Sequence, residues 1–237
     1  MGIGTLSLHP LHAAQVVDDF ESGANPNGWS WTNIDGEATI TPFGGNPGRW
    51  IDTGAPYFAG HPHLISVPPA GSALRTALAS GHLQAASIDI QRLDTTSVVG
   101  CQPTHLQASF VSLALFDFHS ADLEIQAHTT ADPRAAFAAG AFPWQTVAFT
   151  IPAASAQTPP GWELDVPPGI DYTWADLMHN IDGLRFYIGD PDQFAFSACS
   201  HLGADNVVVT YAGGGDVIFR DGFDDVTCAS CDGEPLP

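Results

Sequence analysis

The stretch that decides the fold runs from Ala108 to Phe118 and reads ASFVSLALFDF. Large apolar side chains recur in it on alternate positions, and this period of two marks a half-buried β-strand. A second stretch of this kind, Leu123–Thr129, follows after the short segment His119-Ser120-Ala121-Asp122. The pair predicts two long strands joined by a turn.

Working outward, short segments of the same kind fill most of the chain, between turns rich in its 24 Gly and 19 Pro. Only Trp174–Asn180, which Thr173 can cap, predicts a helix. The Pro-rich stretch Ala153–Pro168 is interpreted as a long connection. These features predict an all-β fold, a two-sheet antiparallel β-sandwich with one short helix; the resemblance described below implies that the sandwich is a jelly roll. Further strands are expected at Val16–Glu21, Trp29–Thr32, Ala38–Thr41, Arg49–Asp52, Leu64–Val67, Leu74–Leu78, Ser87–Arg92, Trp144–Ile151, Leu184–Gly189 and Asp205–Tyr211.

The two ends of the chain differ from its middle. Residues 1–15 are uncharged and mildly apolar and end near Ala13 and Ala14, which favours a signal-peptide remnant or a disordered start over a structured N-terminus. Residues 16–212 are expected to form the sandwich domain. Residues 213–237 begin at a Gly-Gly-Gly stretch and are expected to form an acidic C-terminal tail with a CxxC motif. This organisation predicts a secreted protein, extracellular or periplasmic.

The four cysteines are Cys101, Cys199, Cys228 and Cys231. An even number, in a chain with an export-like start, favours disulfides. Cys101 and Cys199 each lie beside a predicted strand, so we prefer this pair, and Cys228–Cys231 would then close a small loop. Zinc bound at Cys228-Ala-Ser-Cys231 is the alternative, although no second Cys pair and no HxxxH lies nearby.

Charge excludes several classes of partner. The chain has 26 acidic and 6 basic residues, all of the latter arginine, and a formal net charge of -20. Nucleic acid is not an expected partner, because no basic patch is present to release phosphate counterions. Polar residues interrupt the long uncharged run Ser97–Phe116, so membrane insertion is not expected either. Motifs of the GxSxG, P-loop and GxGxxG types do not occur in the sequence.

Short motifs spread between Val16 and Tyr211 carry a resemblance. They are Val17-Asp18-Asp19-Phe20-Glu21-Ser22-Gly23, Asn27-Gly28-Trp29-Ser30, Tyr57-Phe58-Ala59-Gly60, Trp144-Gln145-Thr146-Val147, Trp174–Leu177, Ile181–Phe186 and Ala204–Val209. In this order they resemble bacterial secreted jelly-roll modules related to laminin-IV-type and galactose-binding-like carbohydrate-binding domains. One departure is Ala204, where the family pattern has a large aliphatic residue. Separately, Val217–Asp224 resembles the tails of many secreted proteobacterial proteins, which supports export.

The resemblance also implies a structural Ca²⁺ ion. In the resembling modules, acidic residues of the opening strand meet the Asp of the closing "D-N-V" strand at one edge. The matching residues here are Asp19, Glu21 and Asp205, and carboxylates of this kind suit Ca²⁺. The alternative is that these are solvated or turn-capping carboxylates. Further ligands could come from Asp18 and from the loop of Asn33 and Asp35.

Four aromatic residues could form a platform on which a sugar ring stacks. Trp31, Trp50, Tyr57 and Trp174 lie near predicted loops or strand ends, where rings can stay exposed. The alternative is that most of them belong to the core.

These observations favour a secreted, non-catalytic carbohydrate- or surface-binding module with a structural calcium ion. Its expected partner is a polysaccharide or a cell-surface glycan. Two alternatives stay open. One is an extracellular polysaccharide-active enzyme, a hydrolase or a lyase, whose catalytic pair the sequence does not single out among 26 acidic residues. The other is a purely structural or adhesive surface protein.

Overall fold

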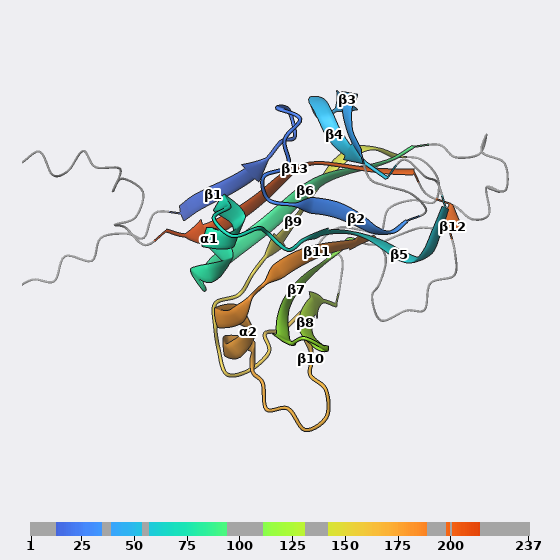
Figure 1. Ribbon diagram of the computed structural model, residues 1–237. Helices are drawn as coiled ribbons and strands as arrows, with labels where there is room; N and C mark the ends of the chain where they lie inside the picture. Colours follow the sequence, from blue (N-terminus) through green and yellow to red (C-terminus); the bar gives the residue numbers. More distant parts are fainter. Residues whose placement is uncertain are drawn as a thin grey trace, which may run out of the picture.

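The computed structural model describes residues 13–34, 39–53, 57–93, 111–130, 142–188, 198–199 and 201–213. Within these residues, thirteen strands and two short helices are present. The strands form two antiparallel sheets that pack face to face (Figure 1). The predicted all-β two-sheet sandwich is therefore confirmed.

The six-stranded sheet is built around its longest strand, β13 (His201–Ala212). One side of β13 pairs with β6 (Leu83–Leu93), and the other side pairs first with β4 (Gly48–Asp52) and then with β1 (Ala13–Asp18). The opening strand thus lies beside the closing strand, as the resemblance implies, with Asp18 opposite Val207. The outer strands of this sheet are β3 (Thr39–Gly45), next to β4, and β9 (Phe142–Thr150), next to β6.

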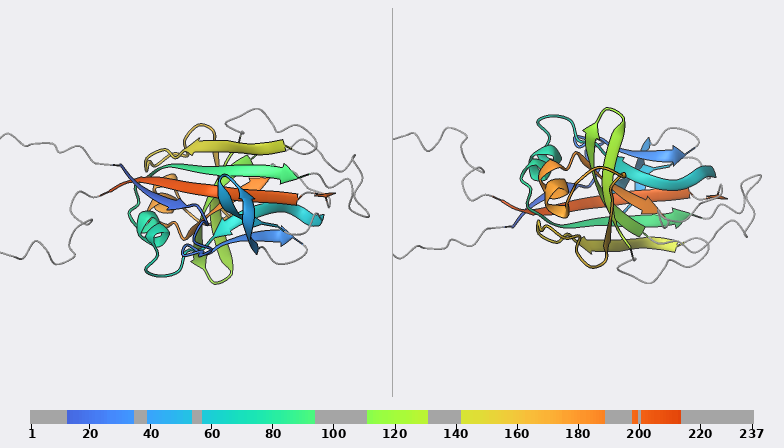
Figure 2. Two further views of the ribbon diagram at one scale, coloured as in Figure 1. Left: turned by 90° about the horizontal axis from the view of Figure 1, so that it is seen from above. Right: turned by 90° about the horizontal axis from the view of Figure 1, so that it is seen from below.

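The seven-stranded sheet has the order β10-β8-β7-β11-β5-β12, and β2 pairs with β5. The two long strands predicted at Ala108–Phe118 and Leu123–Thr129 are neighbours in it, and their pairing continues to Ser120 and Leu123 at the turn. Viewed from above and below, this hairpin crosses the direction of most other strands (Figure 2). The strands are β2 (Trp29–Ile34), β5 (Tyr57–Ser66), β7 (Val111–Ser120), β8 (Leu123–Thr129), β10 (Trp162–Asp165), β11 (Gly183–Ile188) and β12 (Ala198–Cys199).

Leu74–Leu78, predicted as a strand, is part of helix α1 (Ala73–Ala79). The side chain of Ser72 caps this helix by accepting a hydrogen bond from the N–H of Arg75 at 3.2 Å. Three of its residues are alanine, the best helix former, and its buried residues recur at helical spacing. The strand prediction was wrong because a short apolar run does not distinguish a strand from a buried helical turn.

Helix α2 (Trp174–Asn180) has the predicted bounds. Thr173 and Asp176 form a capping box, in which each side chain accepts a backbone N–H of the other residue. Both helices lie at the same end of the sandwich (Figure 1). Each has seven residues, and no helix in the described part of the chain is long and apolar enough to cross a membrane.

Several predicted boundaries differ from the structure, and two of these differences change the expected organisation of the chain. Strand β10 lies inside the stretch that was interpreted as a connection, because Trp162 anchors it through ring packing 5.0 Å from Trp174. Strand β1 begins at Ala13, so residues 13–15 belong to the sheet. Residues 1–12 and the tail beyond residue 213 lie outside the described residues.

The predicted disulfides concern residues of which little is described. Cys199 lies in β12, opposite Tyr57, but its side chain is outside the described part of the structure. Cys101, Cys228 and Cys231 are also outside it. Both disulfides therefore stay predictions.

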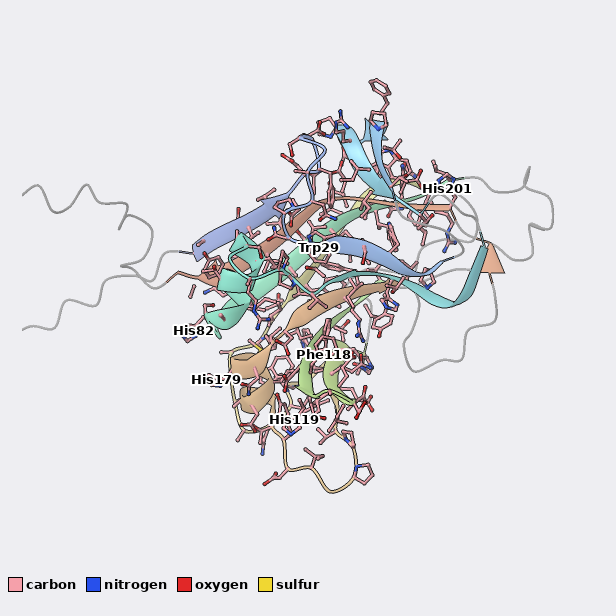
Figure 3. The ribbon with its side chains drawn as sticks, in the orientation of Figure 1. Trp29, His82, Phe118, His119, His179 and His201 are labelled. Atoms are coloured by element: carbon pink, nitrogen blue, oxygen red, sulfur yellow. The ribbon has the colours of Figure 1, made fainter. Side chains whose placement is uncertain are left out.

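Large aromatic rings connect the two layers of the core. Trp29 lies between the sheets (Figure 3), with its ring 5.9 Å from that of Phe186, which in turn lies 6.1 Å from Phe149. These rings come from β2, β11 and β9, so both sheets contribute. Trp144 is only half-buried and packs edge-on against Trp50 at 5.9 Å.

Candidate functional site

The three carboxylates predicted to bind calcium have different roles in the structure. Asp19 is exposed and accepts the N–H of Glu21 at 3.1 Å, which stabilises the turn after β1. Glu21 accepts the N–H of Arg49 at 3.0 Å. Asp205 is fully buried and accepts the N–H of Asn46 at 2.7 Å. Glu21 and Asp205 therefore hold the same turn, between β3 and β4.

Five side chains gather at this turn. The Nδ2 of Asn46 donates to Asp89 Oδ2 at 3.0 Å, and the Nδ2 of Asn206 donates to the same oxygen at 2.8 Å and to the Asn46 carbonyl. These contacts fix the β3–β4 hairpin against the six-stranded sheet. We call Glu21, Asn46, Asp89, Asp205 and Asn206 the turn cluster.

The backbone explains how these side chains approach one another. The pairing of β13 with β6 shifts between Asp205 and Val208, and Asn206 has a φ of +44°, a left-handed conformation that asparagine tolerates. Gly48 has a φ of +82°, and a Cβ there would lie 2.2 Å from the carboxylate of Glu21. Glycine is therefore required for the close approach of Glu21 to the turn.

The turn cluster is not a set of free metal ligands. Hydrogen bonds from N–H groups occupy both Asp205 oxygens, and among the described residues no group of three or more His, Cys, Asp or Glu is placed to hold a metal ion. Asp18, expected as a further ligand, points inward and accepts hydrogen bonds from Asn27 and Trp29. The side chain of Asn33 and all of Asp35 lie outside the described residues.

Asp205 should make stability depend on pH. The pKa of Asp205 is raised to about 6. Burial is the main cause and the charges of Glu21 and Asp89 add to it, while the N–H groups of Asn46 and Asn206 act in the opposite direction. A pKa raised above the ordinary 3.8 means that the folded protein holds the proton more tightly, so this group's stabilisation is lost as the pH rises from about 4 through 6. We expect the Tm of the wild type, relative to that of Asp205→Asn, to fall by about 5 °C between pH 4 and pH 7. Parallel Tm curves for the two proteins would contradict this prediction.

The predicted aromatic platform is not assembled. Trp31, Trp50 and Trp174 are only 5%, 4% and 0% exposed, so their rings are packing residues and cannot stack on a sugar in this conformation. Tyr57 lies in β5 opposite Cys199, and its side chain is outside the described part. The exposed-ring interpretation was wrong for the three tryptophans because nearness to a strand end does not determine which way a ring points.

A different polar surface lies on the outer face of the seven-stranded sheet. Arg185 and Tyr187 alternate along β11 with buried Leu184, Phe186 and Ile188, so they point away from the core. Outward residues of the neighbouring strands extend this surface. We call it the arginine face; it comprises His63, Phe116, Phe118, Glu124, Gln126, Asp165, Arg185 and Tyr187.

Arg185 is the centre of the hydrogen-bond network on the arginine face. Both of its terminal nitrogens donate to the carboxylate of Glu124, a planar bidentate pair. Nη1 also lies 3.4 Å from Gln126 Oε1 and from the Tyr187 hydroxyl, and Gln126 Nε2 donates to Asp165 at 3.2 Å. Burial lowers the pKa of Arg185, but the interactions with Glu124 and Tyr187 outweigh it, so the pKa is raised and the guanidinium stays charged.

Gly183 leaves space for the ring of Phe116, on which Arg185 packs. A Cβ at Gly183 would lie 2.4 Å from the ring of Phe116, so the ring can lie across the strand only because the glycine has no side chain. The guanidinium carbon of Arg185 lies 4.2 Å from the centre of that ring, a cation–π contact. Phe118 packs edge-on at 5.3 Å from Phe116 and is 46% exposed (Figure 3).

An open hollow borders the network at the edge of the sheet. Its volume of about 470 Å³ falls within the range of small-ligand sites. On the other side of Arg185, the half-buried rings of Tyr187 and His63 lie 4.8 Å apart. The hollow is lined by Glu124, Gln126, Leu164, Asp165, Val166 and Pro167.

Sequence reasoning missed the arginine face, although a signal existed. Polar and apolar residues alternate in both Leu184-Arg185-Phe186-Tyr187 and Glu124-Ile125-Gln126, which marks outward positions. What the sequence does not contain is the pairing. β7 lies between β8 and β11, and this places Glu124 beside Arg185 although 61 residues separate them.

Comparisons with protein-family models, curated proteins and solved structures find no match. The resemblance to secreted carbohydrate-binding jelly rolls therefore stays a prediction from the motifs.

Proposed function

We propose that this chain is an extracellular, non-catalytic module that binds carbohydrate through the arginine face. The observation that supports this most is the network of Arg185, Tyr187, Gln126 and Asp165 beside an open hollow. Amide, hydroxyl and carboxylate groups can exchange hydrogen bonds with sugar hydroxyls, and a half-exposed ring such as Phe118 can pack on a sugar's C–H face. Because these groups lie on paired strands, little ordering is needed on binding.

Retention on polysaccharides tests the proposal. In affinity electrophoresis on a panel of soluble polysaccharides, we expect the wild type to be retarded by at least one polymer. Gln126→Ala should weaken this retention about tenfold, because it removes hydrogen bonds at the hollow. The matched control is Gln84→Ala, an exposed glutamine in β6 on the other sheet, which should bind like the wild type.

The outcomes also separate the alternatives. If no polymer retards the protein, carbohydrate binding is contradicted and a structural or adhesive role is favoured. Release of reducing or unsaturated sugar ends would favour an enzyme. The geometry gives less support to a paired-carboxylate hydrolase, since both oxygens of Glu124 accept hydrogen bonds from Arg185.

The predicted structural calcium ion would have to take its ligands from the turn cluster, where backbone N–H groups already bind both oxygens of Asp205. Glu21 and Asp205 approach the same turn, and Asp89 adds a third carboxylate that influences Asp205. If calcium binds there, 5 mM CaCl₂ should raise the Tm relative to EDTA, because a ligand of the native state stabilises it. An unchanged Tm would contradict calcium binding and leave the N–H groups as the stabilising partners of these carboxylates.

A further inference from the structure

The charge of the arginine face restricts which glycans it can take. An acidic sugar needs a cation to receive its carboxylate or sulfate, and on this face the candidate is Arg185. The other described arginines, Arg49, Arg75 and Arg92, lie in β4, α1 and β6 and belong to other parts of the fold.

Arg185 is already neutralised within the protein. Its Nη1 and Nη2 donate to the two oxygens of Glu124, so the nitrogens that would bind an acidic sugar are occupied. The side chain is also 13% exposed and rests on the ring of Phe116. An anionic ligand would have to displace the carboxylate of Glu124, both oxygens of which accept hydrogen bonds from Arg185.

The hollow next to this pair carries a further negative charge. Asp165 lines it, is 45% exposed, and is bound by the uncharged amide of Gln126, with Nδ1 of His128 3.5 Å away. The remaining lining residues, Leu164, Val166 and Pro167, are apolar. With a chain charge of -20, the surroundings repel anions and favour uncharged or amine-bearing ligands.

We infer that the arginine face selects neutral or amino sugars against acidic ones, and that Glu124 determines this specificity by occupying Arg185. The inference rests on the proposed function and deepens it. Glu124 acts here as a built-in competitor for any ligand carboxylate.

The test compares polymers that share a backbone and differ in charge. Suitable pairs are methyl-esterified and de-esterified pectin, hydroxyethyl- and carboxymethyl-cellulose, and dextran and dextran sulfate. We expect the wild type to bind only neutral members. Glu124→Gln keeps the shape but leaves Arg185 with an unpaired charge, so retention on an acidic member should rise at least tenfold and vanish in 0.5 M NaCl. The matched control is Glu163→Gln, an exposed residue of β10 that loses the same charge away from Arg185 and should gain nothing.

Each result decides between the two claims. Wild-type preference for acidic members, or no gain in a folded Glu124→Gln variant, would overturn the inference and leave carbohydrate binding intact. Absence of retention by any polymer, for every variant, would overturn the proposed function and the inference together. If Glu124→Gln has no cooperative melting transition, the preference of the wild type across the pairs decides alone.

Discussion

Replacing Trp174 by alanine should lower the free energy of unfolding by about 3–5 kcal/mol, the range for truncating a buried tryptophan. The ring is fully buried at the start of α2, packs 5.0 Å from Trp162, and donates its Nε1–H to the carbonyl of Ala153 at 3.1 Å. The substitution therefore leaves a cavity between α2 and β10. Equilibrium urea denaturation followed by fluorescence and circular dichroism measures the change.

Phe43 provides the contrasting case for Trp174. It is 82% exposed, so Phe43→Ala should change stability by less than about 0.5 kcal/mol. A Trp174→Ala protein as stable as the wild type would mean that the ring is not in the core. The platform interpretation of Trp174 would then have to be reconsidered.

Replacing Asp18 by alanine should cost about 2–4 kcal/mol, because two buried donors lose their acceptor. Asp18 accepts hydrogen bonds from Asn27 Nδ2 at 2.8 and 2.9 Å and from Trp29 Nε1 at 2.7 Å. Asn27 in turn accepts the N–H of Leu74 at 2.9 Å and binds the Ser66 hydroxyl through its carbonyl. Asp18 thus links β1 directly to β2, and through Asn27 it is connected to β5 and α1.

The adjacent Asp19 is the matched control for Asp18. It is exposed and makes a local turn contact, so Asp19→Ala should cost less than about 1 kcal/mol in the same denaturation experiment. Equal losses for both variants would contradict the assignment of Asp18 to the interior and Asp19 to the surface.

Much of the fold could be predicted from local patterns. The alternation in β7 and β8 and the cap at Thr173 are properties of neighbouring residues, and those elements were placed correctly. Helix α1 was missed because seven residues with three buried side chains fit either period, and β10 because it is held by tertiary packing of Trp162.

The candidate site depends on contacts that local patterns do not encode. The sequence places Asp18 and Asp19 side by side, yet the strand's end directs one into the core and the other to solvent. Likewise, Glu124 of β8 and Arg185 of β11 meet only because both strands pair with β7. Charge and composition identify a strongly acidic chain but do not show which outward residues become neighbours.

The most direct test of the arginine face follows side-chain signals during ligand addition. ¹⁵N-labelled protein is titrated with an oligosaccharide of the best-retained polymer, and the side-chain amide resonances of Gln126 and Gln84 are recorded together with the Nε–H of Arg185. We expect saturable shifts for Gln126 and Arg185, and none for Gln84 on the opposite sheet. Shifts limited to Gln84 or to Asn46 and Asn206 of the turn cluster would place the ligand elsewhere and contradict the proposed site.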